Sequence, residues 1–479
     1  MIISHNPYIP IKASYIFLFL SFIVISLSVM LMFPPGLYMG SLFLLAALVT
    51  YSRFCVEHLF YATWTLVFIN YLLGPLSYQL VGDITLSVVY LFMWFFAFLL
   101  GFKISKALFY VTSKKDIPTP RRMKQIKLFG VFGAFLLVIG GVITAAPYIS
   151  TLDFAGLRSN LFENVSAFSR IGWPLAGAAF FTITHFVHSK NFDDPILTKI
   201  TFLMLSIVPI FSAGRQLYLQ IMLLIILGFL YKKNFMGYEY RSIYPVLGRK
   251  RARFLKQVSV VILGLGTVVS VLRFDFASIE RFSTKLNMFK EYSGVSLRDG
   301  YELIFNFTPV VIQDLFVEFS YYFGAQIPKY FEWFSLNFNQ FQYIWFDLIN
   351  KSPFIARNVD KILTLMEFDF QFTGGSHFVA QYGYVHAFTW STAISSNINF
   401  FGIIGTLVVQ FIFGMVVALS FVGFRNNPNS FSAFNFLVAN SVLVFYGVIA
   451  SVLMETQFLV YYLLSAFYFF SASSFMHRQ

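Results

Sequence analysis

FSAFNFLVANSVLVFYGVIASVLMETQFLVYYLLSAFYFFSASSF, residues 431–475, contains one charged residue, Glu455. A helix that crosses a bilayer needs about 20 mostly apolar residues. The stretch is therefore long enough for two such helices, with a turn around Glu455 between them. An apolar stretch of this length would not be stable on the surface of a water-soluble domain. The stretch therefore predicts a membrane protein.

Similar apolar runs recur along the rest of the chain. The sequence predicts an all-α integral membrane protein of about 12 transmembrane helices, or roughly 11 to 13, because each run is close to the length that spans hydrocarbon. The predicted spans are 13–33, 37–52, 58–79, 84–109, 127–147, 169–188, 198–213, 215–231, 256–273, 398–423, 431–449 and 453–475.

The composition supports this class and excludes others. Hydrophobic residues make up 58% of the 479 residues, charged residues 11%, and the mean hydropathy is +0.72, whereas soluble domains are about 25% charged. Cys55 is the only cysteine, which excludes a disulfide framework and a cysteine-ligated metal. The sequence has no phosphate-binding loop, dinucleotide glycine motif or zinc-protease motif. We therefore expect no metal and no cofactor.

Two strongly basic connections set the predicted orientation, because Lys and Arg collect in cytoplasmic loops. Helix counting from these loops places both termini in the cytoplasm. It also explains the net charge of +13 without a nucleic-acid partner. The first connection holds Lys114, Lys115, Arg121, Arg122, Lys124 and Lys127, and the second holds Lys232, Lys233, Arg241, Arg249, Lys250, Arg251, Arg253 and Lys256.

The same orientation divides the chain into three parts. Residues 1–273 form the first nine helices, residues 274–388 form a large loop outside the cytoplasm, and residues 389–479 form the last three helices. The loop is rich in Phe, Tyr and Trp, which argues against disorder. We expect short helices in it that lie on the outer membrane face, for example at Ile312–Phe323 and Trp345–Lys351.

Arg215 is the most informative single residue. It ends the small-residue turn at 212–215 between two apolar helices, 16 residues after Lys199 and 17 before Lys232. At 1.5 Å per residue each leg spans only about 25 Å, less than the roughly 30 Å of hydrocarbon. With both lysines at the inner boundary, Arg215 is recessed in the outer leaflet, where its planar fork suits a lipid diphosphate. The alternative is an arginine that extends to the outer interface.

Three further arginines lie on the predicted outer side, against the topological bias. Arg158 is in the segment before the sixth helix, Arg170 begins that helix, and Arg273 ends the ninth. Together with Arg215 they suit one anionic group. The alternative is that they anchor helices at the interface and pair with nearby carboxylates, namely Asp153, Glu163 or Asp275.

Candidate groups for proton transfer are few on this side. Glu455 interrupts an uncharged run, where burial would raise its pKa and make it a base, or it is only a turn residue. His386 and His377 lie in a stretch rich in glycine and aromatic residues, where a structural role is the alternative for each. Asp275 follows the ninth helix and is a candidate for substrate binding.

The turn that ends in Arg215, the outward Leu157-Arg158-Ser159-Asn160, the long outer loop, and Asn399-Phe-Phe-Gly402-Ile-Ile-Gly405 resemble the O-antigen polymerases, the Wzy-type oligosaccharide repeat-unit polymerases. The resemblance covers the layout of most of the chain. It implies a GT-C-like helical bundle in the bacterial inner membrane that catalyses an inverting, metal-independent glycosyl transfer on its outer face. Donor and acceptor are polyprenyl-diphosphate-linked oligosaccharides, in O-antigen or capsule synthesis. The diphosphate site maps onto Arg158 and Arg215.

The resemblance also implies partners and leaves alternatives. A flippase and a chain-length regulator are the expected protein partners, and membrane lipid surrounds the helices. One alternative is a flippase or transporter of lipid-linked oligosaccharide, although no repeated halves are evident. The other is an O-antigen ligase. A ligase carries a histidine close before its final outer Gly-x-x-Gly, whereas His386 precedes Gly402 by 16 residues, which favours a polymerase.

Overall fold

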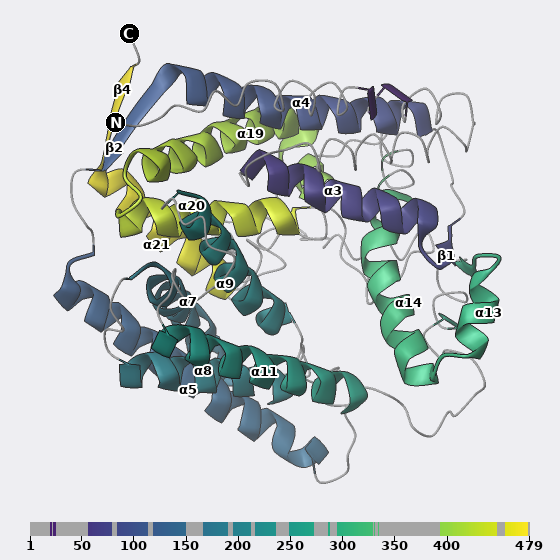
Figure 1. The fold of residues 1–479 in the computed structure, drawn as a ribbon, viewed down its shortest axis with the longest axis horizontal. Coiled ribbons are helices and arrows are strands. Elements are labelled where there is room, and N and C mark those ends of the chain that lie inside the picture. The colour runs from purple at the N-terminus through teal and green to yellow at the C-terminus, as the bar shows by residue number, and fades with distance from the viewer. Residues whose placement is uncertain are drawn as a thin grey trace, which may run out of the picture. The chain divides into compact units, whose positions relative to one another are not determined.

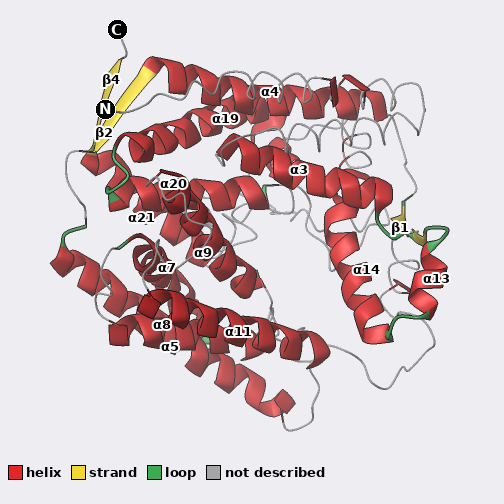
Figure 2. Ribbon diagram, viewed as in Figure 1, coloured by secondary structure: helices red, strands yellow, loops and turns green. Residues whose placement is uncertain are grey.

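A computed structural model of the chain describes residues 56–78, 84–113, 118–149, 166–189, 195–211, 216–235, 249–272, 295–328, 393–447 and 456–477. It also describes residues 20–21, 23–24, 286–287, 330 and 334. This part of the chain is mostly helical, with two short strand pairs (Figure 2). The predicted helix at Trp345–Lys351 and most of the first two predicted spans lie outside the described residues.

The element order follows the apolar runs closely. The helices are α3 (Val56–Leu73), α4 (Ile84–Leu108), α5 (Pro120–Ile149), α7 (Ala167–His188), α8 (Pro195–Phe211), α9 (Gln216–Phe235), α11 (Arg249–Leu272), α13 (Tyr301–Asn306), α14 (Val310–Gly324), α19 (Ala393–Asn426), α20 (Phe431–Tyr446) and α21 (Thr456–Ala472). The strands are β1 (Leu76–Ser77), β2 (Phe109–Ser113), β3 (Ser296–Leu297) and β4 (Ser473–His477). The helix predicted at Ile312–Phe323 is confirmed as α14.

Within the described ranges, three helical stretches are long and apolar enough to cross a membrane: Leu86–Leu108, Pro120–Pro147 and Ile403–Asn426. Shorter apolar helices are Pro195–Pro209, Phe431–Tyr446 and Thr456–Ala472. These findings agree with an all-α membrane protein.

The chain folds into two compact units. Unit 1 contains Met1–Ile104, Ser278–Met415 and Val444–Ser451, and unit 2 contains Ser105–Ala277, Val416–Leu443 and Val452–Gln479. Figure 1 gives the course of the chain through both. The division into residues 1–273, 274–388 and 389–479 is one of membrane topology, and it stays a prediction.

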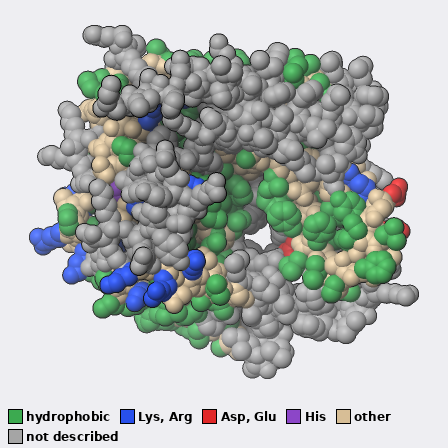
Figure 3. Space-filling view, viewed as in Figure 1, with side chains coloured by type: hydrophobic (Ala, Val, Ile, Leu, Met, Phe, Trp, Pro, Cys, Tyr) green, Lys and Arg blue, Asp and Glu red, His purple; other side chains and the backbone are tan. Residues whose placement is uncertain are grey.

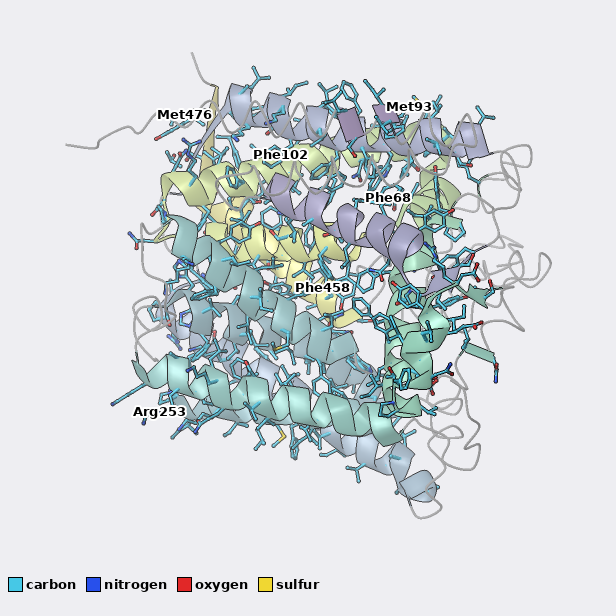
Figure 4. The ribbon with its side chains drawn as sticks, turned by 45° about the vertical axis from the view of Figure 1, so that its right-hand side comes forward. Phe68, Met93, Phe102, Arg253, Phe458 and Met476 are labelled. Carbon is cyan, nitrogen blue, oxygen red and sulfur yellow. The ribbon has the colours of Figure 1, made fainter. Side chains whose placement is uncertain are left out.

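Unit 1 is held together by aromatic packing and by a close helix crossing. Rings from α3 and α4 stack directly, as Phe60 and Phe98 do with centroids 4.4 Å apart. Gly101 of α4 lies against the carbonyl oxygen of Phe411 of α19, so the two backbones touch. Small residues at helix crossings are typical of membrane bundles. Phe102 is fully buried, whereas Met93 is half exposed (Figure 4).

Replacing Gly101 with valine is expected to destabilise unit 1, because the new Cβ would overlap the carbonyl oxygen of Phe411. Overpacking of this kind costs about 1 to 3 kcal/mol. Thermal unfolding of the purified protein in detergent measures the loss. Gly264→Val is the matched control, since a Cβ at Gly264 meets nothing within 4 Å. Equal unfolding temperatures for the two variants would contradict the crossing.

Unit 2 is built on an antiparallel pair, α5 and α7. Gly130 of α5 lies against Ala179 of α7, and Gly133 of α5 against Leu175, with no room for a Cβ at either glycine. α8 packs on both helices, while α9 and α11 pack on α8, as seen in Figure 1. The closely fitted α5–α7 pair therefore provides an axis along which the ends of the other helices of unit 2 are placed.

The strands were not predicted. β2 pairs with β4 antiparallel, from Phe109 opposite His477 to Ser113 opposite Ser473. The predicted last span, 453–475, is therefore wrong at its end, where α21 stops at Ala472 and the chain becomes a strand. In unit 1, β1 pairs with β3, with Leu76 opposite Leu297. These residues satisfy their backbone groups by pairing with a distant segment.

Candidate functional site

Several helices of unit 2 have basic ends, and these ends mark one end of the unit. Exposed Lys and Arg side chains gather at the N-terminal ends of α5 and α11, blue in Figure 3. Three phenylalanines meet beside this end, with centroids 5.6 Å apart for each pair: Phe186 of α7, Phe202 of α8 and Phe254 of α11. The triangle places the end of α7 beside the middle of α8 and the first turns of α11.

Lys232 of α9 fixes the same end of α7. Lys232 is 2% exposed. Its ammonium donates to the carbonyl oxygens of Val187 at 3.1 Å, His188 at 3.0 Å and Ser189 at 3.5 Å. The last carbonyls of a helix have no partner within the helix and carry partial negative charge, so a cation there is stabilising. The sequence assigned Lys232 to an inner boundary but did not indicate this contact.

The C-terminal ends of α7 and α9 lie together. Gly228 of α9 contacts Val187 of α7, and the Lys232 bonds join the C-terminal ends of both helices. Both helices run from this shared end toward their N-termini. Arg170, exposed in the first turn of α7, marks the N-terminal end of that helix, here named the rim level.

The parts of α8 and α9 beyond their contacts with α7 are shorter than the matching part of α7. Phe211, the last residue of α8, is nine residues beyond Phe202, or about 14 Å along the helix. Gln216, the first residue of α9, is 12 residues from Gly228, or about 18 Å along the helix. From Phe186 and Val187, the residues of α7 in contact with Phe202 and Gly228, the same counts along α7 lead to Gly177 and Leu175. By length, both helices thus end about 8 to 10 Å short of the level of Arg170.

A third helix end reaches the same depth independently. α21 begins at Thr456, and a Cβ on Gly177 of α7 would lie 2.6 Å from the carbonyl oxygen of Gln457. We name the level of Leu175–Gly177 along α7 the recessed level. α21 has an end there by contact, and α8 and α9 have an end there by helix length.

Two of the predicted site residues adjoin these ends in sequence. Arg215 directly precedes Gln216, and Glu455 directly precedes Thr456, so both adjoin helix ends at the recessed level. Their own side chains lie outside the described residues. Arg170 is described and lies at the rim level.

The remaining predicted residues also fall outside the described ranges, although their neighbours are informative. Arg273 and Asp275 follow Leu272, the end of α11, which is about 27 Å beyond Phe254 and therefore near the rim level. Arg158 lies in the connection between the ends of α5 and α7. His377 and His386 have no described neighbour.

A buried polar cluster sets the position of α21. Asn435 of α20 bonds to Thr184 of α7 and to Tyr461 and Ser465 of α21. Hydrogen bonds between helices stabilise membrane bundles. This cluster therefore holds α21 on α7 and fixes the depth at which α21 begins. The sequence carries a signal for this cluster, since Asn435 is an amide in an apolar run.

The turn between α8 and α9 is tied at its base. The hydroxyl of Tyr218, in the first turn of α9, donates to the carbonyl oxygen of Ser206 of α8 at 2.6 Å, and Tyr218 is buried. The bond joins the two helices next to the segment 212–215. It therefore fixes the separation of the two chain ends that adjoin Arg215.

Replacing Lys232 with methionine is expected to lower the free energy of unfolding by about 1.5 to 3 kcal/mol, the usual worth of hydrogen bonds to a charged group. The side chain keeps its length but leaves three carbonyl oxygens without the cation. Thermal unfolding in detergent measures the loss. Lys233→Met, at the partly exposed next residue, is the control and should be nearly neutral. Equal effects of the two substitutions would show that the contact contributes nothing.

Arg215 and Glu455, which adjoin these helix ends in sequence, have the chemistry to bind an anion and to transfer a proton. Arginine binds phosphate oxygens in a bidentate manner, and a carboxylate below the surface is suited to proton transfer. Across the described ranges, no three His, Cys, Asp or Glu side chains are grouped to hold a metal ion. No family model, curated protein or solved structure matches this chain. Its function must therefore be inferred from its own residues.

Proposed function

We propose that this protein is a polysaccharide polymerase, a glycosyltransferase that joins polyprenyl-diphosphate-linked oligosaccharide repeat units on the outer face of the bacterial inner membrane. The observation that carries the proposal is the shared depth of three helix ends in unit 2. Two of them adjoin Arg215 and Glu455, the arginine and the carboxylate that the sequence analysis had selected separately.

The depth suits the substrate. The diphosphate of a polyprenyl lipid lies where the lipid tail meets the head group, and the end of α9 that Arg215 precedes in sequence is, by helix length, about 8 to 10 Å short of the level of Arg170. Arg170 at the rim level, with Arg158 and Arg273 on segments that adjoin it, adds positive charge on the side from which the diphosphate and its glycan enter. Asp275 and His377 bind the sugars.

The reaction follows from these roles. A hydroxyl of the acceptor glycan attacks the anomeric carbon of the donor sugar, and the bond from that carbon to the diphosphate oxygen breaks. Arg215 and Arg158 stabilise the charge that develops on the leaving diphosphate. Glu455 takes the proton of the attacking hydroxyl, with His386 as the other candidate for this role. The products are a longer lipid-linked chain and a free polyprenyl diphosphate.

The proposal includes the membrane topology. We infer about 12 spans with both termini in the cytoplasm. The pairing of β2 with β4 supports it, because the loop after α4 and the C-terminal segment, both predicted as cytoplasmic, are hydrogen-bonded to each other. The contact between the C-terminal ends of α7 and α9, both predicted as cytoplasmic, also agrees with the predicted alternation of the spans.

The direct test is a product assay. Purified protein in lipid vesicles, supplied with a polyprenyl-diphosphate-linked repeat unit from the source cell, should form a ladder of longer lipid-linked chains without added metal. In cells, loss of the gene should leave single repeat units on the surface glycan. Loss of all repeat units would indicate a flippase instead, and intact long chains that are not attached to the lipid core would indicate a ligase.

A further inference from the structure

The polarity of α14 is inverted relative to that of a helix in water. Among its described side chains, the exposed ones are Ile312, Leu315, Phe316 and Phe319, which recur at helical spacing on one face. Gln313, Asp314 and Ser320 point the other way, because each is at most 5% exposed, while Glu318 is partly exposed. A helix that faces water carries its polar side chains outward.

The preceding helix continues the apolar surface. Leu303, Ile304 and Phe307 are 68%, 56% and 87% exposed. They share one side of α13 and its end, while the exposed Glu302 lies on another side and Phe305 faces the core. α13 thus has one apolar and one polar exposed edge.

Internal hydrogen bonds fix this orientation. The Gln313 amide donates to the carbonyl oxygens of Phe305 at 2.7 Å and Thr308 at 2.8 Å, across the turn between α13 and α14. The Tyr78 hydroxyl donates to the carbonyl oxygen of Ser320 at 3.2 Å. Val317 and Tyr321 pack in a core cluster with Phe305 and β1 beneath them. Rotation of α14 to expose its polar face would break these contacts.

Another helix of unit 1 also has an apolar exposed surface. α4 contains a candidate membrane span, and its exposed residues, Leu86, Val89, Met93 and Phe96, are also all apolar. In Figure 3 the hydrophobic side chains gather over α13 and α14. Burying a side chain such as Leu, Ile or Phe stabilises by about 1.5 to 3 kcal/mol, so water is an unfavourable neighbour for this surface.

We infer that this surface, formed by Leu303, Ile304, Phe307, Ile312, Leu315, Phe316 and Phe319 and named the α13–α14 apolar face, contacts the acyl chains of membrane lipids. α13 and α14 are thus inserted in the bilayer, although sequence analysis assigned them to an extramembrane loop. α14 is 15 residues long, about 22 Å, and cannot cross the hydrocarbon. α14 therefore enters the bilayer from one side only, and the polar edge of α13 faces the lipid head groups.

Single-cysteine labelling tests this inference, since the chain has only Cys55 to remove. In a Cys55→Ser background, nitroxide labels are placed at Phe307→Cys, Phe316→Cys and Glu302→Cys, and the protein is reconstituted in phosphatidylcholine vesicles. Relaxation by oxygen, which concentrates in hydrocarbon, is compared with relaxation by a water-soluble nickel chelate. The oxygen-to-nickel accessibility ratio should exceed one at residues 307 and 316 and fall below one at residue 302.

Each other outcome overturns the inference. Ratios below one at residues 307 and 316 would place the face in water. Low access for both reagents, as expected for a buried control at Val317→Cys, would mean that protein covers the face. A second measurement uses only variants that elute as a single species and are therefore folded. A bimane fluorophore on the same cysteines should be quenched by lipids with brominated acyl chains at residues 307 and 316 but not at residue 302.

Discussion

The Arg215→Ala variant is expected to make no long polysaccharide, with single repeat units in its place. Loss of one preorganised donor to a developing anion lowers turnover by about 10²- to 10³-fold, and few extensions then occur before a chain leaves. Arg215→Lys should recover little, because an ammonium lacks the bidentate fork that matches a diphosphate. Gel analysis of the surface glycan and turnover in vesicles measure both effects.

Arg253→Ala is the matched control for Arg215. Arg253 is an exposed arginine in the first turns of α11, at the basic end of unit 2 (Figure 4), and its loss should leave the ladder unchanged. Protein amounts are compared by immunoblot. Normal long polysaccharide from both Arg215 variants at normal protein levels would show that the assigned role is wrong.

The Glu455→Gln variant is expected to lower turnover by about 10²- to 10⁴-fold, the usual contribution of a positioned base, while binding of the lipid-linked donor is retained. The amide keeps the size of the carboxyl group but cannot accept the proton. Turnover and donor binding are measured separately in vesicles.

Glu57→Gln, at the start of α3, is the control for the loss of a carboxylate. Its activity should match that of the unaltered protein. If Glu455→Gln keeps full turnover and His386→Gln loses it, the base is His386. A large loss of donor binding in Glu455→Gln would instead assign Glu455 to the donor site.

The helices were predictable because each is encoded locally. The run at 84–109 became α4, which ends at Leu108, and the turn before Arg215 separates α8 from α9 as expected. Hydropathy marks only the part of a helix that lies in hydrocarbon. For this reason α5 begins at Pro120, seven residues before the predicted start, and includes the basic turn that precedes the apolar run.

The arrangement of the site was less accessible to sequence analysis. Arg215 could be selected because its charge conflicts with its apolar surroundings and with the short helices beside it. The agreement in depth between α9 and α21 depends on Gly228 at Val187 and on Gly177 at Gln457. Such contacts join segments distant in sequence, and no local pattern specifies them.

The apolar face of α14 shows a related difficulty. In the sequence, Gln313, Asp314 and Glu318 indicate a solvent-exposed face. Ile312, Phe316 and Phe319 indicate a buried one. The pattern is therefore that of an amphipathic helix. Which face is buried depends on the core on which α14 packs. Gln313 donates to Phe305 of α13, and the carbonyl oxygen of Ser320 accepts from Tyr78, which follows β1.

The strand pair β2–β4 has a consequence for biosynthesis. Ser113 and Ser473, which face each other in the pair, are 360 residues apart in sequence. β2 follows α4 directly, so it cannot be paired until all the helices between the two strands have been synthesised. The end of α4 therefore lacks this partner while those helices are made, and the pair can form only after α21.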